Sequence, residues 1–262
     1  MYNKKTFKLA IVVIVLLITY SCSVEYKVAR EFVKNRSQVD ILLMVDPFVD
    51  MYNQTIEIDS TIYYTDYQLD SIAWYNSKIV QFVDKDRFID AYKNKLISEL
   101  KRYGVRVIEE DSINSYFNSE SKSSWLINVS EFQVMESYFY QPVFKMDATE
   151  YDDEYVKLYS LDFSLWFEIT KMNSNINEKL NLDGYVEEYL EQDTYYDINY
   201  INRIFPDDLY NIADSYGEMH AQYIFDYLLN NYIKRNTKSD TTNNNYYYHY
   251  EPSFKLLFKT AD

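Results

Sequence analysis

Hydrophobic and polar positions follow distinct patterns along the first half of the chain. A largely aliphatic run at 39–45, stopped by a proline, is typical of a strand buried on both faces. Apolar residues then recur every three or four positions over 85–103, which predicts a helix, with Asp84 as its N-cap and Gly104 just after its end. Residues 105–109 have strand character. Together these segments predict a βαβ-like unit with two parallel strands.

The second half of the chain predicts more of the same sheet and a second helix. Residues 125–135 form one strand zone, and strict alternation over 161–169 predicts another. Turn-forming residues at 173–175 lead to a further interrupted apolar stretch, which indicates an antiparallel hairpin. A long helix is expected over 207–233, with Pro206 at its start. In the alternating strand, Trp166 should face away from five residues that face the core: Leu161, Phe163, Leu165, Phe167 and Ile169.

These elements predict an α+β fold, within the broad α/β class. We expect a single mixed sheet packed by two long helices, with the βαβ-like unit near the N-terminus and a helix near the C-terminus. The segment 48–83 is interpreted as an excursion containing a hairpin or a short helix. The expected organisation is a signal peptide at 1–21, a polar tether at 22–38, the α/β domain at 39–234, and a low-complexity tail at 235–262 with a candidate edge strand at 254–258.

The N-terminal residues have the order of an export signal. Lys4, Lys5 and Lys8 precede an uninterrupted apolar stretch, and no acidic residue lies among them. The apolar run from 7 to 20 is shorter than the roughly 20 residues that a spanning helix needs. A cleaved signal is therefore the first interpretation, and an uncleaved membrane span is the second.

The signal ends at the only cysteine of the chain, Cys22. Residues 18–22, Ile-Thr-Tyr-Ser-Cys, resemble a bacterial lipobox, in which a small residue precedes a cysteine that is acylated and becomes the mature N-terminus. Ser21 fits this pattern, whereas Thr19 and Tyr20 resemble the looser version of Bacteroidota. The resemblance implies lipidation at Cys22, palmitate included, and an anchor in the cell envelope, with the outer membrane as the expected location. The alternative is that Cys22 is an ordinary small hydrophobic residue without a disulfide partner.

Charge and composition narrow the classes of partner. The chain has 26 basic and 41 acidic residues, a formal net charge of −15, so it repels phosphate backbones and we expect no nucleic-acid binding. With 47% hydrophobic residues it can build a large core. Thirty tyrosines are explained most simply by an AT-rich genome and strand propensity, and alternatively by an aromatic surface for glycan or protein contact.

Catalytic signatures are sparse. The chain has two histidines, His220 on the apolar stripe of the second helix and His249 in the tail, and neither lies in a motif. There is no Gly-x-Ser-x-Gly elbow, and three glycines leave no usual phosphate-binding loop. His220 is expected to be a core or interface residue. We therefore expect no catalytic residue, no cofactor and no metal site, and hence no enzyme.

Acidic clusters are the remaining candidates for chemistry. A paired-carboxylate hydrolase needs only two acids at a suitable separation. The stretch 150–154 could supply oxygen ligands to calcium, but it lacks the glycine and the spacing of a calcium loop. We interpret all of these acids as solvated residues beside loops or strand ends. The clusters are Glu109, Glu110 and Asp111; Asp152, Asp153 and Glu154; and Glu187 with Glu188.

The order of elements resembles small α/β domains of envelope lipoproteins, namely the periplasmic domain of the curli-secretion lipoprotein and the auxiliary lipoproteins of ABC transporters. The residues that carry the resemblance are Cys22, the strand at 41–45, the passage from Phe88 through Leu96 and Leu100 to Gly104 and Val107, the strand around Trp125, and the helix 207–233. The resemblance implies a non-catalytic, membrane-anchored lipoprotein that binds an envelope partner in assembly, secretion or transport. The alternative function is a surface glycan-binding protein or a paired-carboxylate glycan hydrolase.

Overall fold

The structure is a computed structural model that describes residues 24–56, 61–117, 123–143, 154–172, 179–189, 206–237 and 246–261. The signal segment and Cys22, together with Asp152, Asp153 and the turn at 173–175, lie outside the described residues. The elements in chain order are α2 (Val24–Asn35), η1 (Arg36–Gln38), β1 (Val39–Val45), β2 (Val49–Asn53), α3 (Asp66–Asn76), η2 (Val80–Phe82), α4 (Lys85–Tyr103), β3 (Arg106–Glu109), η3 (Glu110–Ser112), α5 (Ile113–Phe117), β4 (Ser123–Val143), β5 (Glu154–Lys171), β6 (Lys179–Tyr189), α6 (Pro206–Asn236), β7 (Tyr246–Glu251) and β8 (Leu256–Ala261).

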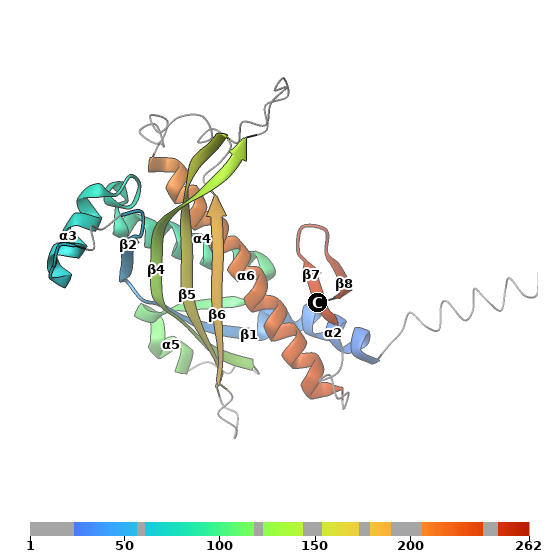
Figure 1. Ribbon diagram of the computed structural model, residues 1–262. Helices are drawn as coiled ribbons and strands as arrows, with labels where there is room; N and C mark the ends of the chain where they lie inside the picture. Colours follow the sequence, from blue (N-terminus) through green and yellow to red (C-terminus); the bar gives the residue numbers. More distant parts are fainter. Residues whose placement is uncertain are drawn as a thin grey trace, which may run out of the picture.

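One mixed sheet forms the centre of the molecule (Figure 1). Its strand order is β3-β1-β4-β5-β6, and β2 also pairs with β4. β1 is parallel to both β3 and β4, which confirms the predicted βαβ-like unit, and β5 is antiparallel to β4 and β6, which confirms the predicted hairpin. Strands β1 and β2 lie end to end along β4, because β1 pairs with 123–129 and β2 with 132–136. The break between them coincides with a register shift in β4, where Glu131 has a φ of 54°.

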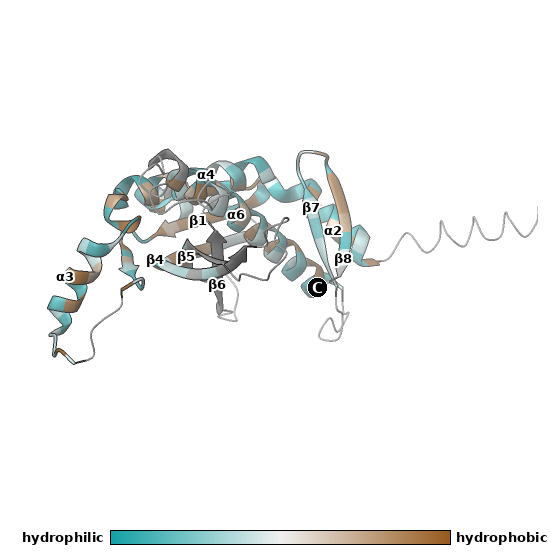
Figure 2. Ribbon diagram, turned by 45° about the horizontal axis from the view of Figure 1, so that its top comes forward, coloured by the Kyte–Doolittle hydropathy of each residue, from teal (hydrophilic) through white to brown (hydrophobic). Residues whose placement is uncertain are grey.

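The two predicted long helices cover one face of the sheet (Figure 2). Asp84 caps α4 by accepting a hydrogen bond from the Arg87 backbone N–H at 3.1 Å, and Gly104 ends the helix with a φ of 89°. The helices approach closely where they cross, because a Cβ atom on Gly217 would lie 2.7 Å from the backbone oxygen of Tyr92. Glycine is therefore the residue that lets α6 pack against α4 at this depth.

The alternating strand faces the core as its sequence predicts. All five predicted inward residues are at most 4% exposed, and Trp166 on the other face is 40% exposed. Phe163 stacks on Tyr216 with ring centroids 4.4 Å apart. Asp162, on the same face as Trp166, is nevertheless buried, and Ser137 Oγ donates a hydrogen bond to its carboxylate at 2.9 Å. A smaller cluster on this face comprises Leu42, Ile108 and Tyr116.

The expected tether is wrong for residues 24–35, which form the helix α2. Ala29 and Phe32 are buried, and the Phe32 ring lies 5.7 Å from Phe225 and 5.3 Å from Tyr232 of α6. The segment looks polar because only Ala29 and Phe32 are fully buried, while Lys27, Arg30, Glu31 and Lys34 are exposed.

The expected low-complexity tail is wrong for residues 246–261, which form a β-hairpin. β7 and β8 make a two-stranded sheet of their own, so the candidate strand at 254–258 is not an edge of the main sheet. Tyr248 and Tyr250 are 4% and 3% exposed and belong to the main core. Asn230 of α6 holds the hairpin by exchanging two hydrogen bonds of 2.8 Å with the Tyr248 backbone. Buried tyrosines, in place of aliphatic residues, thus pack the β7–β8 hairpin against the rest of the protein.

The excursion 48–83 contains the short helix α3 and the 3-10 helix η2, while β2 joins the main sheet instead of a local hairpin. Across the residues that the structure describes, no helix is long and apolar enough to cross a membrane.

Candidate binding site at β2 and α3

Helix α3 projects from the end of the molecule opposite α2 (Figures 1 and 2). Its N-terminus has a capping box, in which Thr65 and Gln68 exchange hydrogen bonds with each other's backbone. None of its 11 residues is buried. Isolated helices shorter than about 12–15 residues are marginal in water. The contacts at its ends therefore matter for holding α3 in place.

A buried carboxylate fastens the C-terminal end of α3 to the sheet. Glu136 of β4 has no exposed surface. It accepts hydrogen bonds from Ser77 Oγ at 2.6 Å and from three consecutive backbone N–H groups, those of Lys78 at 2.9 Å, Ile79 at 2.9 Å and Val80 at 3.1 Å. Charge-assisted bonds of this kind are roughly twice as strong as neutral ones. Glu136 thus fixes the turn that follows α3.

Exposed large hydrophobic residues, most of them aromatic, are frequent in the part of the chain that contains β2, α3 and η2. Among the described residues, 16 large hydrophobic side chains are exposed, and half of them lie between positions 48 and 82. We call this set the α3 aromatic surface. Its members are Phe48, Tyr52, Ile62, Tyr63, Tyr67, Trp74, Tyr75 and Phe82, of which Tyr63, Tyr67 and Tyr75 are 91%, 81% and 80% exposed. Three of these tyrosines and tryptophans, Tyr67, Trp74 and Tyr75, belong to α3 itself.

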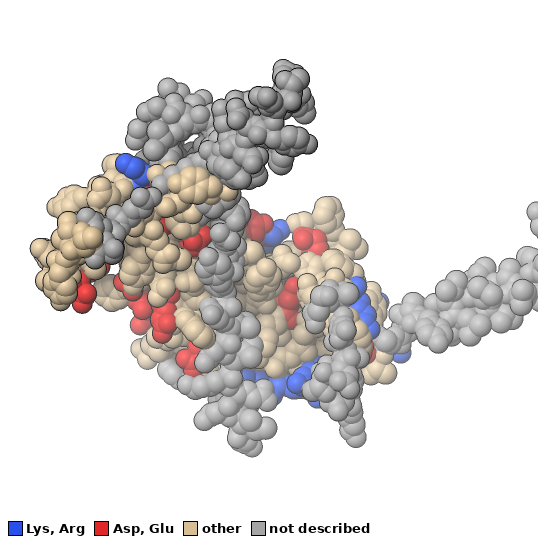
Figure 3. All heavy atoms as spheres, viewed as in Figure 1, with Lys and Arg blue, Asp and Glu red and all other residues tan. Residues whose placement is uncertain are grey.

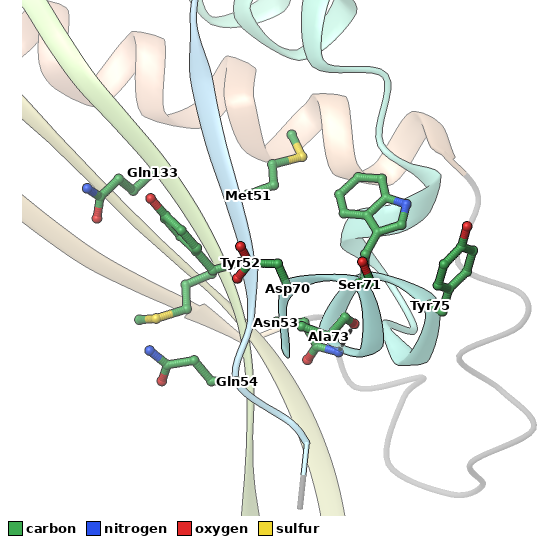
Figure 4. Close-up of a pocket in the computed structure, with 11 residues that line it drawn as sticks. Met51, Tyr52, Asn53, Gln54, Asp70, Ser71, Ala73, Tyr75 and Gln133 are labelled. Atoms are coloured by element: carbon green, nitrogen blue, oxygen red, sulfur yellow. Dashed lines mark hydrogen bonds between the residues drawn. The ribbon is translucent and has the colours of Figure 1, made fainter. Parts of the chain in front are cut away.

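A pocket of about 750 Å³ lies between β2 and α3 (Figure 4). Asn53 Nδ2 bridges its two walls by donating to the Ala73 backbone oxygen at 2.9 Å. Burial and the nearby Asp50 carboxylate raise the pKa of Tyr52. The lining has no Lys, Arg or His, so it suits neutral or cationic groups better than anions. The lining residues are Met51, Tyr52, Asn53, Gln54, Asp70, Ser71, Ala73, Trp74, Tyr75, Gln133 and Met135.

His220 is a core residue, as its position in the sequence predicts. It is 2% exposed, its Nδ1 lies 3.1 Å from the Tyr92 hydroxyl, and its ring packs against Phe167 and Tyr216. Burial lowers the pKa of His220 to about 4. The imidazole is therefore neutral at pH 7.

His249 belongs to a buried pair that sequence patterns do not reveal. Its Nδ1 lies 2.6 Å from Asp226 Oδ2, and Phe258 packs edge-on against the ring at 4.8 Å. Burial raises the pKa of Asp226 to about 6. The pair joins the hairpin to α6, and the Tyr250 backbone N–H also donates to Asp226 at 3.3 Å. No motif signals this arrangement, because the two residues are 23 positions apart.

Of the predicted acidic clusters, the structure describes the side chains of Glu109, Glu110 and Asp111, and none of these three lines the pocket. Glu110 and Asp111 are exposed, and Glu109 pairs with Lys93 at 3.6 Å. The backbone of Glu187 lies opposite that of Asp162 in the register of β5 and β6. Within the described ranges, no group of three His, Cys, Asp or Glu side chains is placed to hold a metal ion.

Comparisons with known proteins find distant structural likenesses alone. No family model and no curated protein sequence matches the chain. A Helicobacter pylori protein assigned as a neuraminyllactose-binding hemagglutinin homolog shares 10% identity over 78% of this chain and 92% of its own, with a TM-score of 0.35. A minor lipoprotein from Acinetobacter baumannii shares 13% identity over 69% of this chain and 91% of its own, with a TM-score of 0.23. Likenesses at this level carry no argument about function.

Proposed function

We propose that the protein is a non-catalytic lipoprotein, anchored to the cell envelope at Cys22, that binds an envelope protein through the α3 aromatic surface. The anchor is supported by the lipobox-like residues 18–22. The observation that carries the binding role is that α3 has no buried residue yet bears Tyr67, Trp74 and Tyr75. Aromatic side chains are enriched at the centres of protein interfaces. The outer membrane is the proposed location, and fractionation of the two membranes tests it.

The arrangement of the molecule supports this role. α2, which starts two residues after Cys22, lies at one end, and α3 lies at the other (Figure 1). An anchor at α2 leaves the α3 aromatic surface accessible to a partner.

Recovery of the partner from solubilised membranes tests the proposal. The full chain with Tyr67→Ser and Tyr75→Ser should lose a partner that the wild type recovers reproducibly, while keeping its stability, because both side chains are exposed. Tyr140→Ser with Tyr223→Ser removes two exposed tyrosines elsewhere and should keep the partner. Equal recovery by both variants, or no reproducible partner for the wild type, contradicts the proposed surface.

A glycan-binding role is the second candidate, and the pocket is the observation that favours it. Tyr52, Trp74 and Tyr75 offer faces for stacking on sugar rings, and the amides of Gln54 and Gln133 offer donors and acceptors. A glycan screen with the detergent-extracted protein separates the two candidates. Binding that Trp74→Ala abolishes supports the glycan role, and turnover that depends on one acid supports a hydrolase. The absence of both binding and turnover would contradict the glycan role.

A further inference from the structure

We propose that the outer face of α2 lies flat along an anionic lipid surface, so that the membrane orients the domain as well as holding it. The proposal deepens the proposed function and rests on it for the anchor at Cys22. The surface that this face of α2 contacts is a bilayer whose headgroups carry negative charge.

The anchor leaves α2 almost no freedom to move away from the membrane. α2 begins at Val24, two residues after Cys22. Two residues reach at most about 7 Å when fully extended. The N-terminus of α2 must therefore lie at the level of the lipid headgroups once Cys22 is acylated, and Val24, at 67% exposed, is the first described side chain to meet them.

The exposed side of α2 carries a basic stripe. Lys27, Arg30 and Lys34 are all exposed, and their spacing of three and four residues places them on one side of the helix. The opposite side is fixed by burial, because Phe32 packs between Phe225 and Tyr232 of α6. The stripe therefore cannot turn inward without unpacking the core.

The acidic residues of α2 are engaged with the protein. The Tyr246 hydroxyl donates to both carboxylate oxygens of Glu25, at 3.1 and 3.0 Å. Glu31 forms a hydrogen bond with Tyr232, and that carboxylate contributes to the raised pKa of Tyr232, after burial. Glu31 is nevertheless exposed beside the stripe, so the three basic and two acidic side chains give α2 a net charge of +1.

The rest of the molecule makes this stripe distinctive. The chain as a whole has a net charge of −15, so an anionic membrane repels most of its surface. On the face shown in Figure 3, most Lys and Arg side chains lie on the half with α2 and β7–β8, whereas Asp and Glu side chains lie on both halves. This asymmetry favours an orientation with α2 down and α3 away from the bilayer.

The position of Asn35 distinguishes a flat α2 from an upright one. α2 has 12 residues, and a helix rises 1.5 Å per residue, so its two ends are about 18 Å apart. In a flat orientation Asn35 lies among the headgroups, whereas in an upright one it lies about 18 Å further out. The test places a fluorophore on the thiol of Asn35→Cys in the acylated full chain, reconstituted in vesicles that contain a headgroup-labelled quencher lipid.

We expect quenching in vesicles containing phosphatidylglycerol and much less in vesicles of phosphatidylcholine alone. A fluorophore at Tyr75→Cys on α3 should not be quenched in either. Adding Lys27→Gln and Lys34→Gln to the Asn35→Cys chain should shift the equilibrium about 30-fold towards the upright orientation and so reduce quenching. Each basic residue near an anionic surface favours the flat orientation by roughly fivefold. The control pair Lys78→Gln and Lys101→Gln removes the same charge from exposed sites outside α2 and should leave quenching unchanged.

Three results would overturn the proposal. They are no quenching at position 35, equal quenching in the two kinds of vesicle, or an equal loss of quenching in the α2 lysine variant and the control lysine variant. Acylation is read separately by intact mass. A chain without acyl mass contradicts the anchor of the proposed function, while the quenching still reports whether α2 lies on the bilayer.

Discussion

Phe163 is the residue on which the aromatic core converges. Its ring contacts Tyr216 at 4.4 Å, and the rings of Phe88, Phe132 and Tyr92 lie at 5.5, 5.4 and 6.4 Å. These neighbours come from both long helices and from β4. A single side chain thus joins the sheet to its helical layer.

Replacing Phe163 with Ala should lower the free energy of unfolding by about 3–5 kcal/mol, because a buried aromatic ring is lost and a cavity remains. Trp166→Ala, three positions along the same strand on the exposed face, is the matched control and should cost much less. Denaturant unfolding of the two variants measures the difference. Equal losses would show that the helical layer does not depend on this contact.

His220 should make stability fall in acid. Its pKa is about 4 in the folded protein and near 6.5 when unfolded, so the folded state favours the neutral imidazole. This contribution is complete above pH 6.5 and is lost as the pH falls from 6.5 towards 4, by about 3 kcal/mol in total. The polar side chains that face the ring are those of Tyr92, Tyr216 and Tyr223, and burial raises the pKa of Tyr92 well above its usual value.

Denaturant titration at each pH measures the unfolding free energies of the wild type and of His220→Asn. The difference in favour of the wild type should shrink as the pH falls from 7 to 4. The asparagine does not titrate, so other groups cancel in the comparison. A difference that stays constant with pH would contradict the burial of a neutral histidine.

Sequence patterns predict single residues only where burial repeats with a regular period. Alternation places Phe163 in the core because side chains of a strand point to alternate faces. Glu136 and the pair of Asp226 with His249 obey no period, since their partners lie at least 23 positions away in the chain. Packing of distant segments creates these contacts, so they become visible only in the folded molecule.

At the scale of elements, the number of fully buried apolar residues decides what can be predicted. The long helices α4 and α6 and the strands β1 and β5 have many of them, and the sequence predicts these elements. α2 is missed because only Ala29 and Phe32 are fully buried among many charged residues, and the β7–β8 hairpin is missed because tyrosines form its buried side. The pocket is unpredictable for a related reason, since β2 and α3 form it together.

Glu136→Gln tests how the element α3 is held. The amide places an NH₂ group where the carboxylate now accepts backbone N–H bonds, so unfolding free energy should fall by about 1–3 kcal/mol. Cleavage by trypsin at Lys78 should also quicken, because the turn after α3 is released. Glu110→Gln, at an exposed acid, should change neither quantity. Unchanged cleavage in Glu136→Gln would mean that other contacts hold α3.

At the scale of the whole molecule, the proposed acylation of Cys22 would decide how the protein is attached to a membrane. Several acyl chains hold a protein stably because each buried CH₂ contributes about 0.8 kcal/mol. Intact mass of the membrane-extracted wild type should show loss of residues 1–21 together with added acyl mass. Cys22→Ala should block this processing and leave a precursor held by residues 7–20.

The alternatives for attachment give different masses. A plain secretory signal yields a cleaved, soluble product with or without the cysteine. An uncleaved span leaves the wild type with its N-terminal segment and no lipid. Finding the unmodified precursor as the mature form would remove the lipoprotein interpretation.

The contacts that α2 and η1 make with β7 have a consequence for the order of events during synthesis. The Tyr246 hydroxyl bonds to Glu25 across 221 positions, and Arg36 lies over the Tyr250 ring at 5.4 Å. These contacts cannot form before positions 246 and 250 have been synthesised. The helix α2 therefore completes its packing only when almost the entire chain has been made. A chain arrested before position 246 should carry an incompletely packed α2.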